Sequence, residues 1–145
     1  YVGDPDEVVV EPILELLKKE TIPVITPLGR GPDGKVYNVN ADVAAAVVAK
    51  ALKARKLAFL SDVPGLLKDP ADPQSIMPTL KMGQVEGLIS RGVIDGGMLP
   101  KVQSGLAALH AGVRKVHIID GRIPHSLLLE IFTDKGVGTE IVWDE

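Results

Sequence analysis

Residues 35–65 read KVYNVNADVAAAVVAKALKARKLAFLSDVPG, and this stretch decides the fold class. Asn38, Asn40 and Asp42 stand where an apolar run begins. Their short oxygen-bearing side chains can accept hydrogen bonds from the unpaired N–H groups of a helix's first turn. Small apolar residues fill positions 41–52. The stretch therefore predicts a capped helix that lies close against a sheet as a buried crossover.

A strand and a polar loop follow this helix. Residues 57–60, LAFL, are apolar without alternation, which is typical of a strand covered on both faces. Residues 61–65, SDVPG, come at its carboxyl end. Open parallel sheets bind ligands outside that edge. The loop is therefore a candidate ligand-binding segment, although by itself it is equally an ordinary turn at a strand end.

The rest of the chain continues the alternation of helix and strand. Glycine and proline clusters separate the segments. Repeated alternation of this kind predicts an α/β fold, with a mainly parallel sheet flanked by helices and right-handed crossovers. The other predicted helices cover residues 10–20, 80–91 and 126–132, and a further helix opens at 92–98 with packing positions Val102, Leu106 and Leu109. The other predicted strands cover residues 22–26, 116–119 and 139–143, and the first of them pairs in a hairpin with residues 36–37.

Composition narrows the class of protein. A chain of 145 residues suits one domain, and because only 3% of residues are aromatic the core must be aliphatic. The net charge of −3 and the scattered lysines argue against a nucleic-acid partner. No apolar run approaches the roughly 18 residues of a membrane span. The absence of cysteine is compatible with a reducing compartment, so we expect a cytoplasmic protein without a membrane partner.

The beginning of the chain lacks the basic segment and apolar core of a signal peptide. It also lacks a methionine. We therefore expect a processed or truncated product.

Lys101 is the first candidate for chemistry. It lies in the first turn of a predicted helix, where a cation opposes the helix dipole by roughly 0.3–1 kcal/mol. An anion beside Gly96 and Gly97 would reverse that effect, since the lysine, the dipole and the glycine N–H groups could all face it. On the residues alone, a solvated surface lysine is an equal alternative. By the same reasoning Asp42 is a first-turn acid and Asn38 a turn residue, while Asn40 is assigned to capping.

Three motifs occur in one order along the chain: NVNAD at 38–42, SDVPGLL at 61–67 and GVIDGGMLPKV at 92–102. In this order they resemble the carboxyl-terminal half of the N-acetylglutamate kinases, in the amino acid kinase family. The resemblance covers essentially the whole chain. It implies an amino acid kinase-like nucleotide-binding half, a single domain over residues 1–145, as a fragment without the amino-terminal substrate domain.

The resemblance also implies roles for individual residues. Lys101 would stabilise the transferring phosphoryl group, Asp42 would hold catalytic lysines in position, and Asn38 would bind the acyl-amino-acid substrate. ATP and Mg²⁺ would be the cofactors; no Walker sequence is present, and no cluster of histidines and acids indicates a structural metal site. The implied nucleotide-binding residues are Asp62, Val63, Pro64, Gly65, Leu66, Leu67, Val93, Ile94, Asp95, Gly96 and Gly97.

A second implied site concerns regulation. In arginine-sensitive relatives the positions that match His117, Glu130 and Gly136 help bind the inhibitor L-arginine, whose guanidinium suits a carboxylate. From the residues alone, His117 within an apolar strand is a core residue and Glu130 a solvated acid. The family's amino-terminal helix that contributes to this site is not found here.

Our hypothesis at this stage is ATP-dependent phosphorylation of the side-chain carboxylate of N-acetyl-L-glutamate, in arginine biosynthesis, by a longer parent that is a homo-oligomer. The isolated chain would bind ATP but lack the second catalytic lysine, and would be catalytically incomplete. One alternative is a non-catalytic nucleotide- or arginine-binding module. Another is a sister kinase with a different carboxylate or carbamate substrate. The hypothesis fails if Lys101 and Asp42 lie on opposite sides of the fold with no cleft joining them.

Overall fold

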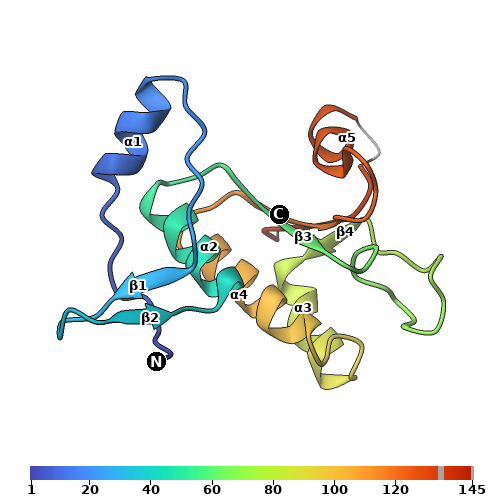
Figure 1. The fold of residues 1–145 in the computed structure, drawn as a ribbon. Helices are drawn as coiled ribbons and strands as arrows, with labels where there is room; N and C mark the ends of the chain where they lie inside the picture. Colours follow the sequence, from blue (N-terminus) through green and yellow to red (C-terminus); the bar gives the residue numbers. More distant parts are fainter. Residues whose placement is uncertain (134–135, 145) are drawn as a thin grey trace.

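The computed structural model describes residues 1–133 and 136–144 and is built around a mixed, mostly parallel sheet (Figure 1). Its strand order is β3-β5-β6-β4. β3 runs parallel to β5 and β4 parallel to β6, while β5 and β6 are antiparallel. The strands are β3 Lys56–Ser61, β4 Thr79–Lys81, β5 Lys115–Asp120 and β6 Thr139–Val142. The predicted α/β class and mainly parallel sheet are confirmed.

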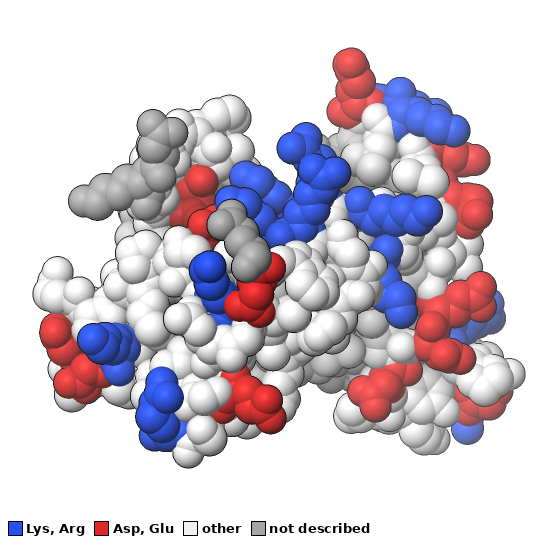
Figure 2. Space-filling model, turned by 180° about the vertical axis from the view of Figure 1, so that it is seen from behind, with Lys and Arg blue, Asp and Glu red and all other residues white. Residues whose placement is uncertain are grey.

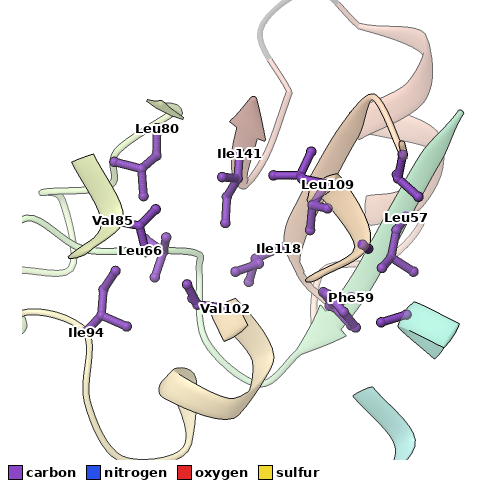
Figure 3. Close-up of a cluster of buried hydrophobic side chains, with 14 of the residues drawn as sticks. Leu57, Phe59, Leu66, Leu80, Val85, Ile94, Val102, Leu109, Ile118 and Ile141 are labelled. Carbon is purple, nitrogen blue, oxygen red and sulfur yellow. The ribbon is translucent and has the colours of Figure 1, made fainter. Parts of the chain in front are cut away.

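Helices cover both faces of this sheet. In Figure 1, α2 (Ala41–Ala51), α4 (Met98–His110) and α3 (Met82–Ser90) lie below the strands, and α5 (Ser126–Phe132) lies above them. The alternation of side chains along a strand explains which residues meet which layer. Phe59 and Ile118 belong to the hydrophobic core, in which Phe59 is an aromatic member among aliphatic side chains such as Val102 of α4 (Figure 3). His117, on the opposite face of β5, contacts Glu130 of α5.

The core is aliphatic, as the composition predicts. Its fully buried side chains come from the central strands, from α3 and α4, and from the connecting segments that carry Ile94 and Val113, which places the packing between sheet and helices. Of the predicted packing positions, Val102 and Leu109 are inaccessible to solvent and Leu106 is partly buried. Burying one such aliphatic side chain stabilises the fold by roughly 1.5–3 kcal/mol. The core therefore fixes the carboxyl edge of β3 and β5 against the first turn of α4.

The amino-terminal segment forms α1 (Glu11–Lys18) and a hairpin of β1 (Leu28–Arg30) and β2 (Val36–Asn38). The predicted strand over residues 22–26 is wrong, because the strand begins only at Leu28. Pro23 and Pro27 lack the N–H groups that a strand ladder requires, so the chain can pair only beyond them. α1 has no buried residue.

Two further predictions need correction. Leu80 lies in β4 and not in the helix, which begins at Met82. Residues 57–60 are not covered on both faces, since Leu60 is 54% exposed. Leu60 lies at the carboxyl end of β3, where the described residues leave its side chain open to solvent.

Charged side chains are arranged unevenly on the surface. Figure 2 shows Lys and Arg gathered in the upper middle of the face opposite to that of Figure 1. The β3–β5 register brings Lys56 beside Lys115, and the amide of Arg114 donates to the carbonyl of Arg55 at 3.2 Å. Basic residues that are scattered in the sequence are therefore partly gathered in space. Within the described residues no helix has the length and apolarity needed to cross a membrane.

Candidate functional site

The first turns of α2 and α4 meet through an ion pair. Lys101 Nζ donates to Asp42 Oδ1 at 2.8 Å and to Oδ2 at 3.0 Å. The lysine side chain is 13% exposed and the aspartate side chain 22%. Lys101 Nζ also lies 5.3 Å from the centre of the Phe59 ring, within the range of a cation–π contact. The required proximity of Lys101 and Asp42 is therefore present in the structure.

Local sequence explains how both side chains come to this place. The Asn40 side chain accepts hydrogen bonds from the N–H groups of Asp42, at 2.9 Å, and Val43, at 3.2 Å, and so caps α2. The assignment of Asn40 to capping is confirmed. Asp42 then stands in the first turn of α2, where a carboxylate is favoured. Pro100 in the first turn of α4 needs no N–H partner, and Lys101 follows directly.

A cleft of about 450 Å³ opens beside this pair, at the carboxyl end of β3. Its volume is within the usual range for small-molecule sites. It lies at the sheet edge where α/β folds bind ligands. The cleft is lined by Leu60, Ser61, Asp62, Val63, Gly97, Met98 and Lys101.

The structure divides the predicted nucleotide-binding residues into two groups. Asp62, Val63 and Gly97 line the cleft. The side chains of Leu66, 3% exposed, and Ile94, 1% exposed, belong to the hydrophobic core instead. Any contact of these two residues with a nucleotide would have to come from their backbone groups.

The remaining predicted nucleotide-binding residues lie around these two groups. Gly65 is buried, Pro64, Leu67 and Val93 are half-buried, and Asp95 and Gly96 are exposed. A Cβ atom at Gly96 or Gly97 would meet no atom within 4 Å. The approach to α4 is therefore open to a ligand.

Asn38 lies at the end of β2, two residues before the cap of α2. Its backbone N–H donates to the carbonyl of Tyr1 at 3.0 Å, and its own carbonyl accepts from Gly3 at 3.1 Å. Its side chain is exposed and does not line the cleft. Its role in substrate binding stays a prediction.

His117, Glu130 and Gly136 come together in a second place, between β5 and α5. His117 Nδ1 lies 2.7 Å from Glu130 Oε1, and Glu130 Oε2 accepts from the Val137 amide at 2.7 Å. Both side chains are more than 90% buried. All three residues line a cavity of about 320 Å³, which is also lined by Lys56, Lys115 and Glu140. Within the described residues, the buried His117 Nε2 has no hydrogen-bond partner.

The carboxylates near the two sites are stabilised in their ionised form. Hydrogen bonds from the Arg122 guanidinium and amide hold the pKa of Asp120 below its usual value. Burial disfavours ionisation of Glu140, but the hydrogen bond and charge of Lys115 outweigh burial and lower its pKa. These acids therefore present negative charge at neutral pH.

The donor set tells how a magnesium ion would be held. No group of three or more His, Cys, Asp and Glu side chains within residues 1–133 and 136–144 could hold a metal ion. Mg²⁺ commonly keeps several waters and binds through one or two carboxylates together with substrate phosphates. Asp62 on the cleft wall supplies one such carboxylate. The residues therefore fit an ion carried by a polyphosphate and not one held by the protein alone.

Sequence reasoning missed some residues of the cleft. Leu60 and Met98 line it but were not among the predicted site residues, and Ser61 was predicted only as part of the candidate loop over residues 61–65. Their positions, at the end of a strand and the start of a helix, were the available signal. The cation–π contact of Lys101 with Phe59 had no local signal, because the two residues are 42 positions apart in the chain.

Comparisons with known proteins identify the family of the chain. A model of the amino acid kinase family matches residues 1–120. The acetylglutamate kinase of Desulfitobacterium hafniense is 51% identical over 139 residues, which are 96% of this chain and 47% of that protein. The acetylglutamate kinase of Carboxydothermus hydrogenoformans is 54% identical over 139 residues, again 96% of this chain and 47% of that protein. The chain spans about half the length of the curated relatives it matches.

Solved structures share the fold. The N-acetylglutamate synthase of Neisseria gonorrhoeae, in complex with coenzyme A and L-arginine, has a TM-score of 0.90 and 30% identity over 99% of this chain and 33% of that chain. The carbamate kinase of Giardia lamblia bound to AMP-PNP has a TM-score of 0.71 and 22% identity over 99% of this chain and 47% of that chain, a likeness that concerns the fold alone. With the family match over residues 1–120, these relationships establish that the chain belongs to the amino acid kinase family.

Proposed function

We propose that this chain is the nucleotide-binding part of an acetylglutamate kinase, which transfers the γ-phosphoryl group of ATP to the side-chain carboxylate of N-acetyl-L-glutamate. The observation that carries the proposal is the contact of Lys101 with Asp42 beside the cleft at the carboxyl end of β3. Identities of about 50% to acetylglutamate kinases over nearly the whole chain support the choice of substrate. Because those relatives are about twice as long, an amino-terminal part would complete the acceptor pocket.

The proposed chemistry is positioning together with charge stabilisation. An oxygen of the substrate carboxylate forms a bond to the γ-phosphorus, while the bond from that phosphorus to the β–γ bridging oxygen breaks. ADP keeps the electron pair and leaves, and an acyl phosphate forms. The ionised carboxylate needs no general base.

Lys101 would neutralise the charge that spreads over the transferring group. Asp42 fixes the direction of the lysine side chain. Removing one such charge-stabilising donor typically raises the barrier by roughly 2.7–4 kcal/mol. Mg²⁺, when bound with ATP, supplies further neutralisation of the phosphates, and Asp62 would be its nearest carboxylate on the cleft wall.

A calorimetric titration of the 145-residue chain with ATP and Mg²⁺, followed by a phosphorylation assay with N-acetyl-L-glutamate, tests the proposal. We expect nucleotide binding with little or no turnover. Efficient phosphorylation by the isolated chain would contradict the need for an amino-terminal part. Absence of nucleotide binding would contradict the nucleotide site.

A reconstitution experiment separates the acetylglutamate kinase from the non-catalytic module and from the sister kinase. Adding a separately produced amino-terminal half of a relative should give transfer to N-acetyl-L-glutamate, and Lys101→Ala should then lower kcat by about 100- to 1,000-fold, as loss of a transition-state donor does. Binding that never leads to transfer would favour a non-catalytic module. Transfer to another carboxylate or to a carbamate would indicate a sister kinase.

We also propose that the cavity between β5 and α5 binds L-arginine as a feedback inhibitor. Its walls carry both signs of charge, with Glu130 and Glu140 as partners for a guanidinium or an amine and Lys56 and Lys115 as partners for a carboxylate. The solved synthase at 30% identity is a complex with L-arginine. Titration with L-arginine tests this proposal, with D-arginine and L-lysine as controls. Equal affinity for all three ligands would contradict a specific site.

A further inference from the structure

The loop over residues 62–67, which follows β3, is anchored at both of its ends. At its start, the amide of Gly121 donates to the carbonyl of Ser61 at 2.8 Å, which ties the end of β3 to the end of β5. At its end, the carbonyl of Leu66 accepts from the amide of Met77 at 2.8 Å. Between these anchors lie Asp62 and Val63, the two loop residues that line the cleft.

A third anchor comes from a distant part of the chain. The amide of Leu66 donates to the hydroxyl oxygen of Thr139 at 2.8 Å, across 73 positions of sequence. Thr139 is fully inaccessible to solvent and Leu66 is 3% exposed. Since water cannot reach this amide, the Thr139 hydroxyl is the partner that satisfies it.

The loop approaches Thr139 more closely than most side chains would permit. Gly65 has φ of +145°, and a Cβ atom there would lie 2.8 Å from the Thr139 hydroxyl oxygen. The glycine thus supplies both the backbone conformation and the space for the Leu66 hydrogen bond. Thr139 itself does not line the cleft.

We propose that Thr139 is a positioning residue for the nucleotide. Its hydroxyl fixes Leu66, and Leu66 fixes the place of Asp62 and Val63 in the cleft wall. This inference rests on the proposed nucleotide site and adds a residue from β6 that makes no contact with the cleft. A purely structural Thr139 would affect the melting temperature but not the nucleotide affinity of the folded protein.

Three substitutions at this position separate the hydroxyl from the rest of the side chain. Thr139→Val keeps the shape and removes the acceptor, Thr139→Ser keeps the acceptor and removes a methyl group, and Thr139→Ala removes both. Leaving the buried Leu66 amide without an acceptor should shift the equilibrium between the anchored and the released loop by roughly 5- to 150-fold. We therefore expect about tenfold weaker nucleotide binding for Thr139→Val. Thr79→Val is a control for the loss of a threonine hydroxyl elsewhere in the sheet, because Thr79 lies at an exposed position of neighbouring β4 and its hydroxyl donates to Glu140 instead of serving the loop.

The experiment is a titration of the 145-residue chain and each variant with ATP and Mg²⁺, well below every melting temperature. Hydrogen exchange of the Leu66 amide is measured alongside. We expect weak binding and faster Leu66 exchange for Thr139→Val, and binding close to the unmodified chain for Thr139→Ser and Thr79→Val.

The contrary outcomes are distinct. If the unmodified chain does not bind the nucleotide, the proposed nucleotide site fails and the role of Thr139 fails with it. If the unmodified chain binds and Thr139→Val binds equally well, only the role of Thr139 is overturned. Weak binding by Thr139→Ser would likewise overturn it, since the hydroxyl is retained. Should Thr139→Val not fold, equal affinities of Thr139→Ser and Thr139→Ala would overturn it.

Discussion

The ion pair between Asp42 and Lys101 makes a quantitative prediction for a double-mutant cycle. The three variants are Asp42→Asn, Lys101→Met and the two combined, which remove each charge with little change of shape. The cycle isolates the energy that couples the two side chains from their other interactions.

The structure bounds the magnitude of that coupling. At an Nζ–Oδ1 distance of 2.8 Å, Coulomb's law gives an attraction of roughly 1.5–6 kcal/mol for effective dielectric constants of about 80 to 20. Desolvation opposes this attraction, since both side chains are less than a quarter exposed. Fully exposed pairs couple by roughly 0.2–1 kcal/mol. We therefore expect a coupling energy of about 1–2 kcal/mol, between the exposed and the buried limits.

The two single substitutions should lower the free energy of unfolding by different amounts. Asp42 without Lys101 still lies in the first turn of α2, where the helix dipole favours a carboxylate. Lys101 without Asp42 remains in the first turn of α4, where the dipole disfavours a cation. Asp42→Asn should therefore destabilise the fold more than Lys101→Met, by about 0.5–1 kcal/mol.

Urea unfolding of the four proteins measures these energies, at low salt and at high salt. High salt should reduce the coupling only partly, because the pair is largely shielded from solvent. A coupling energy below about 0.5 kcal/mol, or a larger cost for Lys101→Met than for Asp42→Asn, would refute the reasoning. Either result would mean that Asp42 does not hold Lys101 in place.

Three further predictions concern packing, acid stability and the second site. Gly138→Ala should destabilise the fold by at least about 1–3 kcal/mol, because the new Cβ atom would collide with the Ile118 carbonyl. Gly87→Ala, within α3, should instead stabilise the fold by roughly 0.5–1 kcal/mol, because the new methyl group meets only the end of Arg91. Urea unfolding of the two variants measures both effects. Because the pKa of Asp120 is lowered in the folded state, the stabilising effect of Asp120 is present above its unfolded pKa and is lost as the pH falls through its folded pKa. Arg122→Met removes the guanidinium partner and should therefore reduce the drop in melting temperature between about pH 7 and about pH 3. An unchanged drop would contradict this. Glu130→Gln should weaken binding of L-arginine in a calorimetric titration, because it removes the buried carboxylate of that cavity; unaltered affinity would contradict the assignment.

Local patterns were sufficient for the central unit of the fold. The helix over 41–52 and the strand over 57–60 are encoded by neighbouring residues, namely an asparagine cap and continuous apolar runs, and both were found where predicted. The prediction of a strand over residues 22–26 was wrong because it followed the apolar composition of the segment. Pro23 and Pro27 lack the N–H groups that strand pairing requires. Leu80 was misassigned because a strand of three residues, β4, has too few positions for a period to be recognised.

Contacts between distant segments were beyond the reach of local patterns. The antiparallel pairing of β5 with β6 depends on the whole sheet, so strand alternation predicted a mainly parallel sheet but not which pair of strands is antiparallel. The exposure of Leu60 depends in the same way on what lies beside β3. Resemblance supplied what periodicity could not, since it identified His117 and Glu130 as one set, and the structure brings them to 2.7 Å.

The two candidate sites share one short piece of backbone. Residues 136–139 begin at the cavity wall, where the Val137 amide donates to Glu130, and end at Thr139, which holds the amide of Leu66. Gly138, in the middle of this segment, lies so close to Ile118 that a Cβ atom on Gly138 would collide with the carbonyl of Ile118. We therefore expect a ligand that displaces Val137 to shift the segment that leads to Thr139, and through Thr139 the loop over residues 62–67. Such a link changes nucleotide affinity only if the ligand binds the two arrangements of the loop with different affinity, and the effect is then reciprocal. In that case a nucleotide that orders the loop would alter the binding of L-arginine by the same factor.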